Sequence, residues 1–214
     1  MVSTIPRVRK LVLLMLLAAP AAAVTVDRIA AVIDGQVVTV SEIAQMAEIR
    51  FFARLAQSDD DHRREILDAL IAQALRYRDV ERFGAQDLSA DTIEARFLEI
   101  QRRFPSEAEF NAALARAELS ADEVRALVKR QLQVEAYIQE RFAPLVFVTS
   151  EEIEEYYTNT WSPARRERGL PVPPLLEVRE EVRTAVRSSR LQVEIDRWTS
   201  QLRARANVDV YAWR

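Results

Sequence analysis

The chain has 214 residues, no cysteine, and 30 basic against 33 acidic residues, which gives a formal net charge of −3. The absence of cysteine excludes disulfides, thiol nucleophiles and thiolate zinc sites. The acidic balance argues against a nucleic-acid-binding protein, which needs a basic patch. Packing must therefore hold the fold together, and the chain is long enough for one sizeable core or two small lobes.

Residues 1–23 have the pattern of a secretory signal peptide. Arg7, Arg9 and Lys10 form a basic region, residues 11–19 an apolar one, and residues 20–23 are Pro-Ala-Ala-Ala. The apolar run is short for a membrane span, so a short signal anchor is the alternative. We expect cleavage near Val24. The remaining chain would carry 27 basic and 33 acidic residues, a net charge of −6.

Residues 26–42, VDRIAAVIDGQVVTVSE, predict a β-hairpin that leads directly into a helix. Two apolar runs flank Asp34 and Gly35, which tolerate the positive φ angles of a type I′ turn. The expected pairs are Ile33–Gln36, Val32–Val37, Ala31–Val38, Ala30–Thr39 and Ile29–Val40. A two-stranded ribbon alone is marginal in water. We therefore predict that residues 207–211, NVDVY, add a third strand to it.

Helix-start signals recur along the chain, mostly a Ser or Thr with a Glu three residues later. Together with apolar stripes at helical spacing, they predict helices over about 40–57, 61–83, 90–104, 107–117, 121–143 and 150–157. Gly84 occupies the position of a left-handed C-cap residue.

Residues 158–174 contain one of the three glycines and four of the eight prolines. We read this stretch as a loop or linker, with Trp161 anchoring it to the rest of the protein. A last helix is predicted over 175–206, and its apolar stripe changes sides at Ser188 and Ser189. Val178, Val182 and Val186 share one side, whereas Leu191, Ile195, Trp198 and Leu202 share the other.

This phase change predicts that the last helix packs against two partners on opposite sides, or bends at the serines. Its second half should bring Trp198 and Leu202 onto the same core as the hairpin. The predicted fold class is mainly α with a small antiparallel sheet. The N-terminal hairpin is joined by the C-terminal strand, and a multi-helix lobe and a long C-terminal helix complete the fold.

No stretch of the sequence has the pattern of an active site. His62 follows three aspartates, but at a helix start a capping role is favoured over a metal site or proton relay. Glu151, Glu152, Glu154 and Glu155 could hold a cation, although acids in the first turns of a helix usually complement its dipole. There is no Gly-x-Ser-x-Gly elbow and no Gly-rich phosphate loop. We predict no catalytic residue, metal or cofactor.

The candidate binding residues are aromatic. Phe51 and Phe52 would lie about 100° apart on a helix, which makes burial of both against one neighbour awkward. The segment from Phe97 to Phe110 is thin in apolar residues for helices that need cover on several sides. Core packing is the alternative for each. Spare apolar surface without a catalytic group suggests binding of extended peptides, with Phe51, Phe52, Phe97, Phe104 and Phe110 as candidate contacts.

Three segments resemble the SurA-type periplasmic chaperones. Residues 26–43 are similar to the opening hairpin of the mature proteins, and residues 64–97 to the helical segment that follows. Residues 176–211 resemble the terminal helix and strand shared by SurA- and PrsA-like foldases. The resemblance covers roughly 26–157 and 175–211. The residues at matching positions are Leu67, Leu70, Ile71, Leu75, Gly84, Ile93, Val178, Val182, Trp198, Leu202, Val208 and Tyr211.

The expected division starts with the signal peptide (1–23) and has a linker at 158–174. The resemblance implies a SurA N-terminal-like helical domain with its hairpin (24–157) before this linker and a C-terminal helix and strand (175–214) after it. The last part would complete a trigger factor/SurA peptide-binding-like core. Family members usually carry a parvulin prolyl-isomerase domain where this chain has 158–174. That interval is far shorter than the roughly 50 residues of a small domain, so we expect the isomerase to be absent.

The function implied by the resemblance is an ATP-independent periplasmic holdase for unfolded outer-membrane or envelope polypeptides. It would have no isomerase activity, no nucleic-acid partner and no membrane span after signal cleavage. The alternatives are an interaction scaffold that docks one specific envelope partner, and a foldase enzyme, which the missing domain disfavours. A dimer that covers the aromatic helices would also explain them, and the sequence leaves the oligomeric state open.

Overall fold

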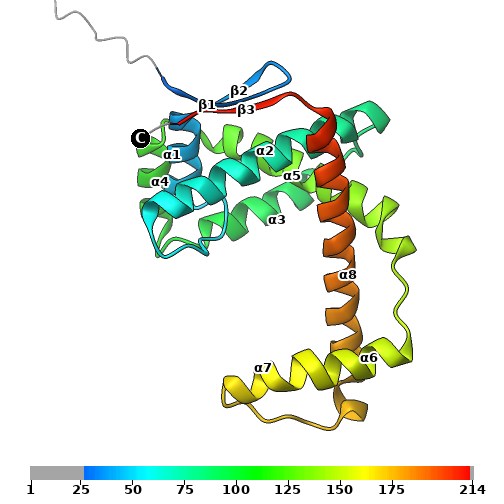
Figure 1. Ribbon diagram of the computed structural model, residues 1–214. Coiled ribbons are helices and arrows are strands. Elements are labelled where there is room, and N and C mark those ends of the chain that lie inside the picture. The colour runs from blue at the N-terminus through cyan, green and yellow to red at the C-terminus, as the bar shows by residue number, and fades with distance from the viewer. Residues whose placement is uncertain (1–26, 213–214) are drawn as a thin grey trace, which may run out of the picture.

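A computed structural model describes residues 27–212 of the chain. The predicted signal peptide therefore lies outside the described residues. Most elements form a body, from which one long helix extends and carries a smaller helical unit at its far end (Figure 1). We call residues 27–142 with 191–212 the body, and residues 150–186 the foot.

The body carries a three-stranded antiparallel sheet. Strands β1 (Ile29–Ile33) and β2 (Gln36–Thr39) form the predicted hairpin, and β3 (Val208–Val210) pairs with the other edge of β1. Asp34 and Gly35 have φ angles of 48° and 91°, as a tight I′-type turn requires. The predicted closure of the two chain ends is confirmed.

The hairpin register agrees with the prediction from the turn up to the Ala31–Val38 pair. Beyond it the register shifts, and Ile29 lies opposite Thr39. The predicted Ala30–Thr39 and Ile29–Val40 pairs are wrong, because the ladder is irregular between Ile29 and Ala31. Val40 already begins a helix, and its amide donates to Arg28 O at 2.8 Å.

Helix α1 (Val40–Glu48) ends about nine residues before the predicted end. Arg50 adopts a left-handed conformation with φ 52°. The amide of Phe51 donates to Met46 O at 2.9 Å and that of Arg50 to Ala47 O at 3.1 Å. These two bonds form a Schellman motif, which stops the helix. The chain then turns Phe51 into the core, so the long helix predicted to about residue 57 is wrong.

The next four helices follow the predicted start signals. They are α2 (Asp59–Phe83), α3 (Ala90–Gln101), α4 (Glu107–Arg116) and α5 (Ala121–Arg141). Each starts with a serine whose hydroxyl accepts a backbone N–H three residues on, which satisfies one orphan donor of the helix terminus. Helix α2 ends at Gly84 with φ 95°. The body core lies between these helices and one face of the sheet and includes Ile43, Ile71, Ile100, Phe110, Val124 and Val128.

The long helix α8 (Leu175–Arg205) packs against two partners. Val182 and Val186 lie in a cluster with Ile153 and Trp161 of the foot. Trp198 lies in a second cluster with Val80 and Tyr137 of the body, while Leu202 contacts both this cluster and the core beneath the sheet. The predicted two-sided packing is confirmed. Leu202 reaches the core beneath the hairpin, as predicted, whereas Trp198 lies in the second cluster and not in that core.

The foot is more helical than predicted. It contains α6 (Ser150–Tyr156), the π-helical turn η2 (Tyr157–Trp161) and α7 (Ser162–Glu167). The predicted loop is therefore wrong for residues 158–167 and holds only for the remainder, up to α8. Pro163 lies in the first turn of α7, directly after the π-helical turn η2. The predicted anchoring by Trp161, which is 9% exposed, is confirmed.

A single 3-10 turn, η1 (Ala143–Leu145), leads from α5 toward the foot. Over residues 27–212, every helix is too short or too polar to span a bilayer.

Candidate polypeptide-binding site

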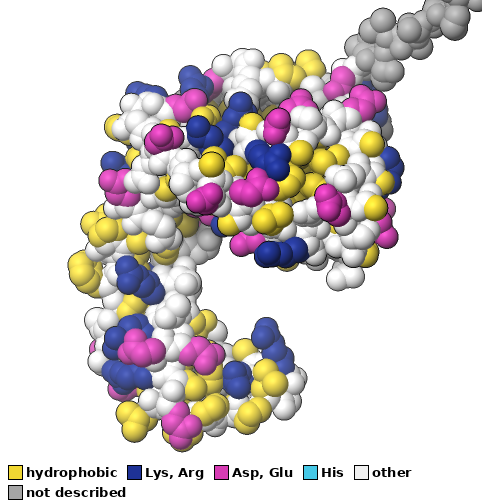
Figure 2. Space-filling model, turned by 180° about the vertical axis from the view of Figure 1, so that it is seen from behind, with side chains coloured by type: hydrophobic (Ala, Val, Ile, Leu, Met, Phe, Trp, Pro, Cys, Tyr) yellow, Lys and Arg dark blue, Asp and Glu magenta, His cyan; other side chains and the backbone are white. Residues whose placement is uncertain are grey.

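The molecule curves around a wide hollow between the body and the foot (Figure 2). We call this concave region the cradle. Its back is α8, which is continuous from foot to body. Residues 187–190 of α8 are exposed and lie between the stretches that pack on foot and body. The depth of the cradle therefore depends on how firmly each end of α8 is attached.

At the body end, α8 is attached through an aromatic cluster. The ring of Trp198 lies 5.5 Å from that of Tyr137 and 5.2 Å from that of Phe142. Trp198 Nε1 donates to Asp79 Oδ2 at 3.1 Å, and Arg76 Nε donates to Thr199 Oγ1 at 2.7 Å. Burial raises the pKa of the Tyr137 hydroxyl. These contacts join α8 to both α2 and α5.

At the foot end, the attachment combines packing with hydrogen bonds. Trp161 Nε1 donates to Glu181 Oε1 at 3.3 Å, and its ring stacks on Tyr157 with centroids 5.5 Å apart. Arg190 of α8 donates to Phe147 O at 3.0 Å and forms an ion pair with Glu152 of α6. Arg187 donates to Ala143 O at 3.1 Å. Residues 143–149, which we call the connecting segment because they join α5 to α6, are thus held along α8.

The free end of the foot is basic. Arg165, Arg166 and Arg168 lie at the end of α7 and just beyond it, and Figure 2 shows basic side chains at this tip beside the hollow. Arg165 stacks over the ring of Trp161 at 4.7 Å and donates to Pro171 O at 2.8 Å. The tip therefore offers guanidinium groups to the opening of the cradle.

The structure places the five predicted contact residues in two environments. Phe51, Phe97 and Phe110 are core side chains, with exposures of 4%, 5% and 1%. Phe52 and Phe104 are half-buried at the margin of the same core. The difficulty expected for adjacent phenylalanines does not arise, because α1 has ended before them and their rings meet edge to face at 5.1 Å. Peptide contact by these residues stays a prediction, and in this conformation it would involve Phe52 and Phe104.

Phe147, the exposed aromatic residue of the connecting segment, was not among the candidate contacts predicted from the sequence. Phe147 is 76% exposed, and Leu145 and Val193 nearby are 69% and 54% exposed. Leu145 and Val193 line a shallow hollow of about 440 Å³ together with Arg190 and Glu194. We call Leu145, Phe147 and Val193 the outer patch. The signal was present in the sequence: after Pro144, four apolar residues follow in a stretch that starts no helix.

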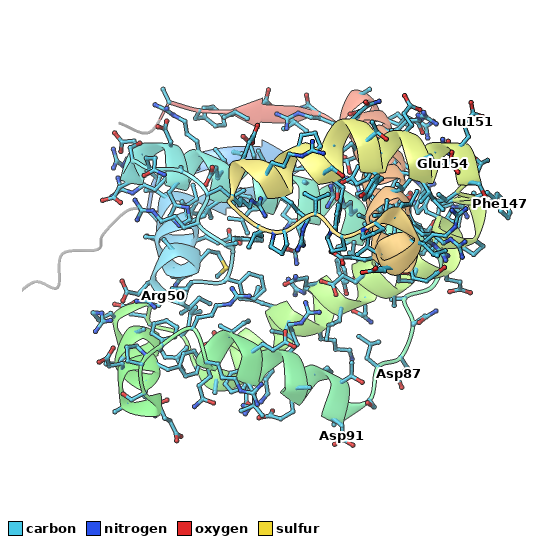
Figure 3. The ribbon with its side chains drawn as sticks, turned by 90° about the horizontal axis from the view of Figure 1, so that it is seen from below. Arg50, Asp87, Asp91, Phe147, Glu151 and Glu154 are labelled. Atoms are coloured by element: carbon cyan, nitrogen blue, oxygen red, sulfur yellow. The ribbon has the colours of Figure 1, made fainter. Side chains whose placement is uncertain are left out.

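Arg50 lies at one end of the molecule, whereas Phe147, Glu151 and Glu154 lie at the opposite end (Figure 3). Arg50 lines a second hollow, of about 540 Å³, with residues of α1 and α4 and with Phe104. This hollow could not be predicted from the sequence, because the predicted helix over about 40–57 ran through Arg50 without a break.

The described residues offer little for metal or acid–base chemistry. In residues 27–212, no three His, Asp or Glu side chains gather in a way that could hold a metal ion. His62 is buried in the first turn of α2, with Nδ1 3.5 Å from Glu65 Oε2. Glu152 accepts from the Thr149 amide at 2.8 Å in a capping box and pairs with Arg190. Glu152 is thus already engaged in capping α6 and in an ion pair.

Comparison with known proteins agrees with the resemblance seen in the sequence. No family model matches the chain. The chain is 26% identical over 139 residues to Chaperone SurA of Saccharophagus degradans and 29% identical over 141 residues to Chaperone SurA of Pseudomonas putida. These matches cover 62% and 64% of this chain, but 32% and 33% of the relatives. The chain is SurA-like, and the matched region spans about a third of the length of these relatives.

Proposed function

We propose that the chain is an ATP-independent periplasmic chaperone that holds unfolded outer-membrane or envelope polypeptides in the cradle. The observation that carries this proposal is the open concave surface between body and foot in a chain similar to proteins named Chaperone SurA. The predicted signal peptide supports an extracytoplasmic location. Nothing in the proposed activity requires a nucleotide, a metal or a cofactor.

The dimensions of the cradle suit unfolded chains rather than a small ligand. Helix α8 has 31 residues, which corresponds to about 45 Å at roughly 1.5 Å per residue. Exposed apolar side chains occur in both the body and the foot, where Leu55 before α2 and Leu176 at the start of α8 are 80% and 87% exposed. Clients must be ordered on contact, so we expect weak and rapidly reversible binding.

We also propose that the chain has no prolyl-isomerase activity. Residues 158–167 fold as part of the foot and pack through Trp161 onto α8. This supports the idea that the interval completes a helical unit instead of holding an inserted domain. A protease-free isomerisation assay should show no turnover above a heat-inactivated control, and measurable turnover would contradict this part of the proposal.

The outer patch supports the alternative function, an interaction scaffold. Leu145 and Val193 line the same hollow, and Phe147 is exposed two residues along the chain from Leu145. A small apolar patch fits one dedicated partner better than many unfolded clients. Leu145→Ser with Val193→Ser would separate the two functions. A general holdase should keep its activity in this variant, whereas a scaffold should lose its partner.

The cradle can be tested by site-specific crosslinking, because the chain has no cysteine. Single cysteines at Leu55 and Arg166 would carry a photoreactive group on the body and on the foot tip. A cysteine at Asp209 of β3 is the matched control, since the sheet lies on the far side of the body from the foot (Figure 1). We expect a urea-unfolded outer-membrane β-barrel protein to crosslink from the first two positions. Equal or greater crosslinking from Asp209 would contradict the proposed site.

A further inference from the structure

Arg50 occupies a backbone position where glycine is the usual residue. Its φ of 52° lies in the left-handed region, at the C′ position of the Schellman motif that ends α1. Residues other than glycine are disfavoured in this conformation, because their Cβ atom comes too close to the backbone. Non-glycine residues held in strained backbone conformations cluster at functional sites.

The Arg50 side chain contacts Phe104 with one face of its guanidinium and bonds Arg103 with one of its N–H groups. Its guanidinium lies 4.5 Å above the Phe104 ring and donates to Arg103 O. Arg103 in turn donates to Phe51 O at 2.8 Å and to Arg50 O. Among residues 27–212, no carboxylate lies within salt-bridge distance of Arg50, and the residue is exposed. One face of a fixed, charged group therefore rests on an aromatic ring.

The hollow beside Arg50 has space and positive charge. Ala44 and Ala47 of α1 face Ala112 of α4, and these small side chains leave a volume of about 540 Å³. Typical ligand pockets have about 300–1,000 Å³. Arg63 and Arg116 also line the hollow, against Glu48 and Glu109. Arg116 pairs with Glu48 at 2.7 Å and Arg63 with Asp60 at 3.4 Å, so among residues 27–212 Arg50 is the arginine of the lining that has no carboxylate partner.

We propose that this hollow binds an acidic side chain that neighbours an aromatic residue in an unfolded polypeptide. The carboxylate would accept hydrogen bonds from the edge of the Arg50 guanidinium that does not bond Arg103 O. The neighbouring ring would stack on the guanidinium face opposite Phe104, because a planar guanidinium stacks well on aromatic rings. The proposal relies on the proposed function only for the source of the polypeptide.

The test is binding of short dye-labelled peptides to the intact chain, measured by fluorescence anisotropy. A capped peptide containing Asp-Phe between Gly and Ser residues should bind at least fivefold more tightly than its Asn-Phe and Asp-Ala counterparts. Its affinity should fall with rising salt, since the contact is between charges at the surface. Equal binding of the Asp-Phe and Asn-Phe peptides, or no binding of either, would overturn the proposal.

Arg50→Gly is the decisive variant, because glycine suits the backbone conformation at this position. The substitution should weaken Asp-Phe binding at least fivefold while the fold is kept. Glu118→Gly is the matched control, since Glu118 has φ 53° in an equivalent motif at the end of α4 but does not line the hollow. Arg183→Gln on α8 controls for loss of a positive charge. Unchanged binding in Arg50→Gly, or equal losses in the controls, would overturn the assignment.

Peptide binding and holdase activity can fail independently. A chain that binds Asp-Phe peptides but does not prevent aggregation would retain this site and lose the proposed function. A chain that prevents aggregation equally well with Arg50→Gly, and shows no preference for the Asp-Phe peptide, would retain the function and lose this site.

Discussion

Arg190 of α8 and Glu152 of α6 form an ion pair beside the backbone of Phe147, whose carbonyl accepts a further bond from Arg190. This is the point at which the connecting segment, the foot and α8 meet. The Glu152 side chain is 23% exposed, so solvent screens the pair less than a fully exposed one. We expect this contact to help fix the orientation of the foot, and with it the width of the cradle, together with the packing of Trp161 on α8.

Arg190→Ala should loosen the foot without unfolding the body. Loss of the pair and of the hydrogen bond should cost on the order of 1 kcal/mol, and hydrogen exchange in α6 should accelerate. Arg183→Ala is the control, because Arg183 pairs with Glu180 within α8. Unchanged exchange in α6 would show that packing alone fixes the foot.

Trp161→Ala should unfold the foot selectively. Trp161 packs against Ile153, Val182 and Val186, which form the small cluster of the foot. Truncation of a buried Trp costs about 3–5 kcal/mol, which is large for so small a cluster. Hydrogen-exchange mass spectrometry should show lost protection in residues 150–186 and retained protection in α2. Leu176→Ala, at an exposed site on the same unit, should have no effect. Concerted loss in both regions would contradict a separate foot.

Glu118→Gly should stabilise the protein modestly. The left-handed conformation of Glu118 costs roughly 1–2 kcal/mol for a residue with a Cβ, whereas added unfolded-state entropy of glycine offsets about 0.5–1 kcal/mol of the gain. The net expectation is an increase of about 0.5 kcal/mol in the free energy of unfolding, measured by urea titration. A loss of stability would mean that Glu118 makes a contact that outweighs its strain.

Glu42→Gln should stabilise the fold at neutral pH and have no effect in acid. Burial is the main cause of the raised pKa of Glu42, from an ordinary value of 4.5, and outweighs its bond from the Thr39 amide. A raised folded pKa favours the protonated form, so the contribution of Glu42 to stability is present below pH 4.5 and lost as the pH rises through the folded pKa.

The difference in the free energy of unfolding between Glu42→Gln and wild type should therefore appear as the pH rises from 4.5 through the raised pKa of Glu42 in the folded state. It should persist at higher pH. Its expected size is on the order of 0.5 kcal/mol, as is usual for partly exposed substitutions. Urea titrations at pH 4 and pH 7 would measure it. A destabilised variant at pH 7 would show that the ionised carboxylate is favoured in the folded state.

Local chemistry explains why much of the fold could be predicted. The turn at Asp34 and Gly35 needs only its own residues, and the capping box of Ser120 and Glu123 involves two side chains of one helix turn. The two-sided packing of α8 followed from its 3.6-residue period. Each of these signals lies within a single turn or a single helix.

The incorrect predictions depend on contacts between distant segments. Helix α1 ends just before Arg50. Arg50 and Arg103, which are 53 positions apart, each donate to the backbone carbonyl of the other. The prolines at 158–174 suggested a loop, but packing of Trp161 on α8 makes most of the stretch helical. Burial of Phe97 and Phe110 also required the tertiary arrangement, because helical spacing alone does not tell a core ring from a binding ring.

The most direct test of the central claim is aggregation of a urea-unfolded outer-membrane β-barrel protein diluted with and without residues 24–214, in the absence of ATP. Light scattering would follow the reaction, with serum albumin as a control for nonspecific protection. The proposed holdase should suppress scattering at near-stoichiometric amounts. No suppression by a chain whose circular dichroism shows the expected helices would contradict the general chaperone function.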